Sequence, residues 1–383
     1  ARSESGWSSY SDVDSSPLPI LDIAWHEDYR QNSAEIRLTS DTLRAFDYIV
    51  GLYYLDSRLD SEAAMVFEPT FTLAPGLLGF DQAFSQGSIG RDVRLYSLFA
   101  TGSWHIQDRW HVTLGVRYAD EERNYQRTAD CLPVRNGIID FDPTASDRAI
   151  INTRGTDLVC ATGDGFSDTR QAYNWMPELA LSWDMNPDVR WYAKYSRSVK
   201  SGGWVAALLA HEAHLEFDEE TASGWELGMR SHLRRRALGL NFALFDTRLD
   251  DMQLTAYEQD TFLSAGMNAA AVRSRGLEAD LTWQAAPWLN LILSYAYLDA
   301  SFGNFENARC PLGEVRAGKA PPCDASGKTL PLAPEHSAGL RASVRKRLAS
   351  GPFFLAGLNA GYSSSYFTES SLEPGLMQPS YTI

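Results

Sequence analysis

Apolar and polar residues alternate along much of this chain with a period of two. Between residues 110 and 118, Trp, Val, Leu, Val and Tyr occupy the even positions, while His, Thr, Gly and Arg occupy the odd ones. The same alternation recurs at residues 225–230, 238–244 and 276–283. Because successive side chains of a β-strand point to opposite faces, the pattern predicts strands with one apolar and one polar face.

About thirteen strands are predicted in this way, separated by connections that are short and long in strict alternation. The predicted strands are residues 1–12, 32–41, 45–57, 92–105, 109–125, 172–184, 188–199, 222–234, 237–256, 268–284, 288–302, 336–348 and 352–366. The six short connections carry turn residues and lie at 41–44, 107–108, 186–188, 235–236, 286–287 and 350–352. The long ones are residues 13–31, 58–91, 126–171, 200–221, 257–267, 303–335 and 367–379.

This segregation of short and long connections predicts an all-β fold, an antiparallel transmembrane β-barrel. Such barrels have short turns at the periplasmic end and long loops at the extracellular end. Aromatic residues near the predicted strand ends fit the interfacial girdles of a barrel; they are Trp104, Trp110, Trp183, Trp191, Trp225, Trp283 and Trp288. The alternative is a soluble β-protein in which these aromatics belong to the core.

Composition removes two other classes of protein. The net charge of -15 and the pI near 4.9 exclude nucleic acid as an expected partner, because phosphate binding needs clustered Lys and Arg. The longest apolar runs, at residues 205–210 and 353–358, are far shorter than the roughly 20 residues of a membrane-spanning helix. A barrel strand needs only about 9–11 residues, so the negative mean hydropathy of -0.28 is compatible with it.

Four cysteines form two close pairs in polar stretches rich in Gly, Pro and Asp. Cys131 with Cys160 and Cys310 with Cys323 are expected to form disulfides in an oxidising compartment; the alternative is four unrelated free thiols. Residues 1–10 lack the apolar segment of a signal peptide, and residues 380–383 look like the start of a strand. We therefore expect both ends to be artificial, and the chain to be a piece of a longer protein.

Several segments, in order along nearly the whole chain, resemble motifs of TonB-dependent receptors. The segments are SAEIRLTS (33–40) with FDYIVGLYY (46–54), PELALSW (177–183) with WYAKYSRSVKSGGW (191–204), WELGMR (225–230), NFALFD (241–246) with Met252-Gln253, and Asn268 with RGLE (275–278). Ser198 stands where the family usually has Gly, and Trp204 where it has Phe.

The resemblance implies that residues 1–383 are one partial barrel domain, from a barrel of about 22 strands whose plug domain and terminal strand are missing. It implies a bacterial outer-membrane receptor, in contact with outer-membrane lipid, that imports a ferric siderophore with energy from TonB. Cobalamin, haem or an oligosaccharide are alternative cargoes, and a passive porin is an alternative function. An outer-membrane enzyme is disfavoured because no catalytic motif is found; we expect neither enzyme activity nor a cofactor.

The resemblance also points to lumen residues that hold the plug. Glu226 and Glu278 lie on the predicted polar face and match barrel glutamates that in the family pair with plug arginines. Glu178 and Arg230 share this face and are expected to join the network. The alternative for Glu226 and Glu278 is an ordinary solvated lining, and for Glu178 and Arg230 it is that they only balance the charge of this face. A charge on the lipid face would cost about 2–4 kcal/mol near mid-membrane, which favours the lumen.

The connection at residues 200–221 supplies the candidates for ligand contact, namely Lys200, Trp204, His211 and His214. The spacing His-Glu-Ala-His is not the His-Glu-x-x-His of zinc proteases, so we expect no metal centre there. The acidic stretches at 216–220 and 250–251 offer calcium ligands, but a solvated loop is the preferred interpretation.

Overall fold

The computed structural model is almost entirely β-structure. The described residues are 1–12, 21–40, 45–67, 82–107, 109–135, 138–139, 165–205, 215–233, 237–257, 264–268, 271–306, 308–320, 322–369 and 371–383. No helix in these parts of the chain is both long and apolar enough to cross a membrane.

One antiparallel sheet of 15 strands contains most of the chain, and its strands are hydrogen-bonded in sequence order. The strands are β1 (Arg2–Asp12), β2 (Leu21–Thr39), β3 (Phe46–Phe67), β4 (Gln82–Ile106), β5 (Trp110–Arg135), β7 (Phe166–Asn186), β8 (Val189–Lys200), β11 (Glu220–Leu233), β12 (Leu238–Asp250), β15 (Val272–Ala286), β16 (Leu289–Phe302), β17 (His336–Arg347), β18 (Phe353–Ser363) and β21 (Tyr381–Thr382), with β6 (Ile138–Ile139) beside β5.

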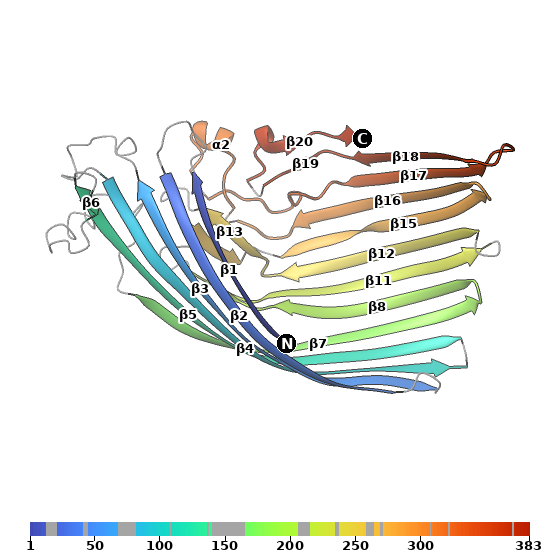
Figure 1. Cartoon of the computed structure of the whole chain (residues 1–383), viewed down its shortest axis with the longest axis horizontal. Coiled ribbons are helices and arrows are strands. Elements are labelled where there is room, and N and C mark those ends of the chain that lie inside the picture. Colours follow the sequence, from blue (N-terminus) through green and yellow to red (C-terminus); the bar gives the residue numbers. More distant parts are fainter. Residues whose placement is uncertain are drawn as a thin grey trace.

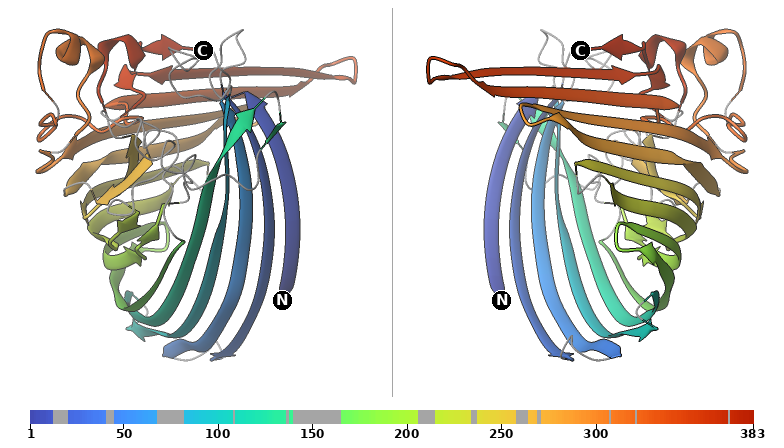
Figure 2. Two further views of the ribbon diagram at one scale, coloured as in Figure 1. Left: turned by 90° about the vertical axis from the view of Figure 1, so that its left-hand side faces the viewer. Right: turned by 90° about the vertical axis from the view of Figure 1, so that its right-hand side faces the viewer.

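The sheet curls into an open trough, with β1 at one edge and the C-terminal strands at the other (Figures 1 and 2). On its polar face several side chains are buried, among them Ser61, Ser97 and Asn174. On the opposite face large apolar side chains such as Leu98 and Leu179 are exposed. Side chains crowd together on the inside of a curved sheet, so we assign the polar face to the concave side.

The thirteen predicted strands correspond one to one to the first thirteen strands along the sheet, which confirms the all-β antiparallel prediction. The turn at 186–188 joins β7 to β8, that at 286–287 joins β15 to β16, and Gly351 (φ 105°) lies in the turn between β17 and β18. The predicted turns at 41–44 and 235–236 lie outside the described residues.

The prediction of long connections at residues 13–31, 58–91 and 126–171 is wrong at their ends. Strands β2 to β5 and β7 continue into these ranges and reach 19, 22, 25, 26 and 21 residues, whereas β8 and β17 have 12 each. We call the end of the sheet with the long connections the loop end, and the end with the short connections the turn end. Since about 9–11 residues cross a bilayer, these strands project far beyond it at the loop end.

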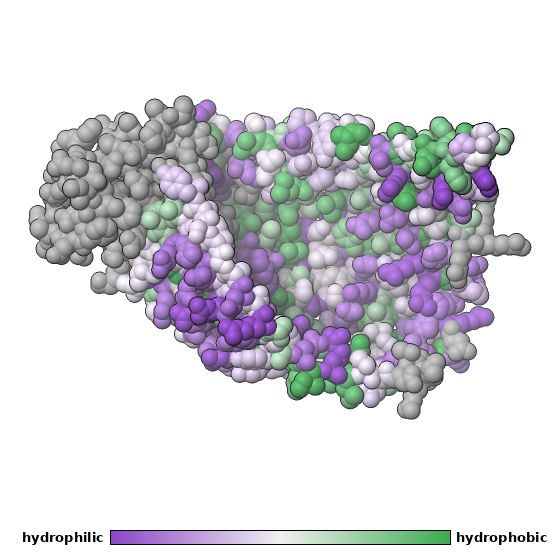
Figure 3. Space-filling model, viewed as in Figure 1, coloured by the Kyte–Doolittle hydropathy of each residue, from purple (hydrophilic) through white to green (hydrophobic). Residues whose placement is uncertain are grey.

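The outer face of β2 shows why the parts of these strands beyond the bilayer were not predicted. There Leu38 and Ile36 give way to Asn32, Arg30 and Asp28, and all five side chains are exposed. Past this point the outward positions are polar, so the apolar outer face on which the prediction relied disappears although the backbone pairing with β3 continues. In Figure 3 the lower left, where the N-terminal strands lie, is mostly hydrophilic.

Two further predictions are corrected at the loop end. The predicted strands 237–256 and 268–284 are interrupted, because β12 ends at Asp250 and Asp251 adopts a positive φ of 56°. Beyond it, β13 (Gln253–Tyr257) and β14 (Ser264–Asn268) form a separate hairpin. The predicted connection 200–221 similarly contains β9 (Gly203–Trp204) paired with β10 (Glu216–Phe217).

A small apolar core lies under the loops near the ends of β15 and β16. Val272, Phe302, Phe305, Ala308 and Ala325 form it and are at most 5% exposed. Near it lie a short helix, α2 (Leu312–Arg316), and, nearer the C-terminus, the strands β19 (Tyr366–Phe367) and β20 (Met377–Gln378) with the 3-10 turn η3 (Pro374–Leu376). This core holds the long connections of this region against the end of the sheet.

Candidate functional site: the polar face of the sheet and its two ends

The outer face carries an apolar band bounded by aromatic pairs at both ends. At the turn end Trp110 stacks on Trp183 with ring centroids 5.6 Å apart, and at the loop end Tyr118 meets Trp175 at 4.9 Å. From residue 110 to 118 the strand rises about 26 Å, which tilt shortens to roughly 20 Å. With the ring sizes added, this matches the apolar band of about 25 Å in membrane barrels.

Glu226, Tyr192 and Arg230 form one polar cluster on the opposite face. The Tyr192 hydroxyl donates a hydrogen bond of 2.5 Å to Glu226, and the Arg230 guanidinium lies 5.2 Å from the centre of the Tyr192 ring. Gly228 makes this possible, because a Cβ there would lie 2.4 Å from Cζ of Tyr192. The structure therefore brings the two predicted charges of β11 together through a tyrosine of β8 that sequence reasoning missed.

The other two predicted glutamates lie on the same face in different surroundings. Glu178 on β7 pairs with Lys194 of β8 at 3.5 Å. Glu278 on β15 is exposed and lies opposite Ala243 and Ala296 on the neighbouring strands. Among the described residues it has no hydrogen-bond or ion-pair partner. Glu278 thus presents a free carboxylate on the concave face.

At the loop end, two motif residues join three separate segments. The side-chain amide of Gln253 donates to the carbonyls of Ser201 at 2.9 Å and Asp218 at 3.0 Å. Asn268 accepts from the Asp218 backbone N–H at 2.6 Å and donates to the carbonyls of Asp218 and Asp251. We call this set of contacts the neck. It holds the hairpins β9–β10 and β13–β14 side by side.

An arginine and an aromatic stack complete the neck. Arg170 of β7 binds Glu216 at 2.8 Å and Asp218 at 3.0 Å. Trp204 is 5% exposed and stacks on Tyr125 with centroids 5.4 Å apart. Trp204, a candidate for ligand contact, is therefore packed into the neck. The family-like Gly at position 202 leaves room for the arginine, because a Cβ there would lie 2.8 Å from its Cζ.

Of the remaining candidates for ligand contact, only Lys200 lies within the described residues. Lys200 is exposed and its Nζ lies 3.9 Å from Glu220. His211 and His214 lie outside the described residues, as does the proposed pairing of Cys131 with Cys160.

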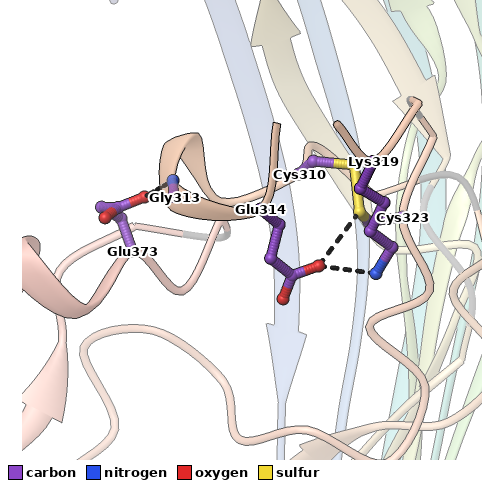
Figure 4. The surroundings of a disulfide bond; sticks show 6 residues. All are labelled: Cys310, Gly313, Glu314, Lys319, Cys323 and Glu373. Carbon is purple, nitrogen blue, oxygen red and sulfur yellow. Dashed lines mark hydrogen bonds and ion pairs between the residues drawn. A yellow bond between two sulfur atoms is a disulfide. The ribbon is translucent and has the colours of Figure 1, made fainter. Parts of the chain in front are cut away.

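Cys310 and Cys323 are joined by a disulfide beside helix α2 (Figure 4). Both cysteines are at most 2% exposed. Glu314 lies next to the bridge and accepts a hydrogen bond of 2.5 Å from Lys319, whose ammonium lowers the pKa of Glu314. The backbone N–H of Gly313 approaches Glu373, which lies in another connection, between β19 and η3. The bridge therefore fixes the base of the polar connection between β16 and β17.

At the turn end, a chain of polar side chains crosses five neighbouring strands on the concave face. Asp47 binds His105 at 2.7 Å, His105 binds His111 at 2.7 Å, and His111 binds Asp184 at 2.8 Å. Arg190 closes the chain with two hydrogen bonds to Asp184. One signal for this chain of contacts was present in the sequence, a His on the polar face at position 111, but its partner Asp184 lies 73 residues away.

These arrangements are suited to binding. The concave face offers charged and hydroxyl groups already oriented by neighbours, and the loop end offers tethered hairpins. Within the described residues, no group of three or more His, Cys, Asp or Glu side chains is arranged to hold a metal ion.

Comparisons with known proteins agree with this geometry. Residues 3–383 match the family model described as TonB dependent receptor-like, beta-barrel. The metal-pseudopaline receptor CntO of Pseudomonas aeruginosa is 26% identical over 302 residues, covering 76% of this chain and 35% of the relative. The ferric yersiniabactin uptake receptor FyuA of Yersinia pestis has a TM-score of 0.68 at 18% identity, with 94% of this chain and 46% of that chain covered.

A second solved structure, the siderophore receptor PiuA of Acinetobacter baumannii, has a TM-score of 0.64 at 15% identity. It is matched over 94% of this chain and 49% of its own. The chain therefore spans between about a third and a half of the length of these relatives. At these identities the solved structures show a common fold.

Proposed function

Because this chain belongs to the TonB dependent receptor-like, β-barrel family, we propose that it forms part of the wall of a receptor that imports a chelated metal, most specifically a ferric siderophore, with energy delivered by TonB. Proteins of this family are receptors and transporters of the bacterial outer membrane. The outer membrane is therefore the location of this chain. The cargo and the partner TonB belong to the proposal.

The observation that carries the proposal is the division of the sheet into two faces. The outer face presents an unbroken apolar band between aromatic pairs, as lipid requires. The inner face presents carboxylates and guanidinium groups, which a plug domain can bind by charge-assisted hydrogen bonds. The relatives named above are receptors for metal-pseudopaline, ferric yersiniabactin and a siderophore, which favours a chelated metal over cobalamin or a sugar.

The concave-face glutamates support a plug held from inside the barrel. Glu278 is free and exposed, so it is the strongest candidate to bind a plug arginine. Glu226 is already oriented by Tyr192 and keeps further acceptor positions, since a carboxylate has about four. In this proposal Glu178 and Arg230 balance the charge of the contact surface.

At the loop end, the neck sets where the ligand enters. The tethered hairpins keep the exposed Lys200 beside the mouth of the lumen, where its ammonium would attract an anionic chelate. Trp204 supports the neck by packing, and the ligand is expected to meet other groups of these connections.

An uptake experiment in the parent bacterium tests the proposal. The gene of the complete receptor is deleted, and uptake of radiolabelled iron is measured under iron limitation with individual siderophores, before and after complementation. The expected result is loss of uptake for one siderophore class, restored by the gene and abolished by a tonB deletion or a protonophore. Unchanged iron uptake would refute the cargo, whereas uptake that persists without TonB would favour a passive channel.

A further inference from the structure

The histidine pair at the turn end has an arrangement that needs a cation between its two rings. His105 and His111 are directly paired in register on β4 and β5, just either side of the tight turn. Their Nδ1 atoms face each other at 2.7 Å. Each Nε2 atom is directed at a carboxylate, Asp47 for one ring and Asp184 for the other, at 2.7 and 2.8 Å.

The carboxylates decide where the ring protons are. An ionised carboxylate only accepts hydrogen bonds, so each Nε2 must carry a proton and donate it. A neutral imidazole has one N–H, which leaves both Nδ1 atoms as bare acceptors that point at each other. Two facing lone pairs repel, and the contact becomes favourable only when a positive species, either a proton or a metal ion, lies between them.

We propose that His105 and His111 form a binding site for a divalent transition-metal ion, coordinated through the two Nδ1 atoms and oriented by Asp47 and Asp184. Imidazole nitrogen suits Zn²⁺, Ni²⁺ and Cu²⁺. Metal-binding histidines almost always donate their second N–H to a carboxylate or carbonyl, which fixes the tautomer and makes the ligand more basic. Both rings have that second contact here.

Charge and access also favour a cation at this position. The two carboxylates flank the pair, and Oδ1 of Asp47 is buried with no hydrogen-bond partner among the described residues. Arg190 neutralises only the Asp184 end. The four side chains of the pair and its carboxylates are 21–34% exposed. A cavity of about 640 Å³ opens beside Asp184; Arg109, Arg190 and Arg230 also line it, and neither histidine of the pair does.

Geometry requires only a small movement of the rings. Two bonds of about 2.0–2.1 Å with a tetrahedral angle place the nitrogens about 3.3 Å apart, so the rings separate by roughly 0.6 Å. The other coordination positions remain for water. With two protein ligands the site suits reversible capture of an ion at the periplasmic mouth of the lumen, and its existence does not depend on the proposed cargo.

The test uses the complete, tag-free receptor in detergent, with Cu²⁺ as the spectroscopic probe and Zn²⁺ in calorimetric titration. One ion per chain is expected, with electron paramagnetic resonance hyperfine structure from two imidazole nitrogens. H105Q and H111Q should each remove that signal, while H26Q, a histidine on the outer face, should leave it unchanged.

A second variant separates loss of the site from loss of the fold. D184N keeps both histidines and is expected to weaken Zn²⁺ binding about 10- to 100-fold, the usual effect of changing a partner of a metal-binding histidine. Heat-modifiable gel migration checks that each variant folds. Equal Cu²⁺ spectra in wild type, H105Q and H111Q would overturn the proposal. So would a wild-type protein that binds neither ion, since the pair would then hold only a proton.

Discussion

Gly228 has no side chain, and the ring of Tyr192 occupies the space that one would take. Gly228→Ala is therefore expected to push the ring away from Glu226 and to lower the stability of the folded receptor by about 1–3 kcal/mol, as overpacking does. Thermal unfolding followed by gel migration measures this. Gly357→Ala is the matched control, because its nearest neighbour would be 3.9 Å away. Equal melting of the two variants would contradict the packing argument.

Charge at two positions of the concave face is expected to hold the plug. Glu226→Gln combined with Glu278→Gln removes the negative charge and preserves side-chain size, so hydrogen exchange of the plug in the complete receptor should become faster. Glu62→Gln is the control, since Glu62 is exposed and lies opposite His26 in register on the outer face. Plug protection that stays as in wild type would rule out these carboxylates as plug contacts.

At the scale of elements, the neck depends on a few amide side chains. Asn268→Ala removes three hydrogen bonds to Asp218 and Asp251, each with a net contribution of about 1 kcal/mol. Hydrogen exchange should accelerate in β10 while β11 and β12 keep their protection. Asn359→Ala, an exposed site on β18, should change neither region. Uniform acceleration across the barrel would show that Asn268 supports the whole sheet instead.

The disulfide supports a different element, the connection between β16 and β17. Replacing Cys310 and Cys323 by Ser opens a loop with a sequence separation of 13, and the chain-entropy model assigns about 3 kcal/mol to such a closure. Protease cleavage within residues 303–335 should become faster, with the barrel strands still resistant. Cleavage at the wild-type rate would indicate that the small core around Phe302 is sufficient to order this connection.

Strands and their order could be predicted wherever lipid requires an apolar residue at every second position. Outside the bilayer the ends of the strands could be predicted less well. Residues 110–118 face lipid at every second position, so their pattern specifies the strand directly. Beyond the bilayer Asp28 and Arg30 occupy outward positions, so the strand no longer has the apolar outer face on which the prediction relied. The period of two was enough to place Glu226 and Glu278 on the face opposite the apolar band.

The contacts between distant strands were not predictable. Tyr192 reaches Glu226 across 34 residues and His111 reaches Asp184 across 73, and register between strands is set by pairing that no local pattern contains. Gly228 offered an indirect signal, since a glycine inside a strand often marks a close approach. The identity of the approaching side chain required the structure.

At the scale of the whole molecule, the sheet has two unpaired edges. The outer backbone groups of β1 have no partner strand among the described residues, and at the other edge β21 pairs with β18 through only two residues. In lipid, each unsatisfied peptide group costs several kcal/mol, so only closed barrels span a membrane. Residues 1–383 expressed alone are therefore expected to fail to insert as a stable monomer into lipid vesicles.

Gel electrophoresis with and without boiling measures this directly, because folded barrels migrate differently from unfolded chains. The complete receptor should show the shift, and residues 1–383 alone should show none and should instead associate through their edges. Adding the rest of the receptor as a separate chain should restore the shift if the missing strands close the barrel. A heat-dependent shift of the isolated chain as a monomer would mean that β1 and β18 close on each other, and the proposed larger barrel would then be wrong.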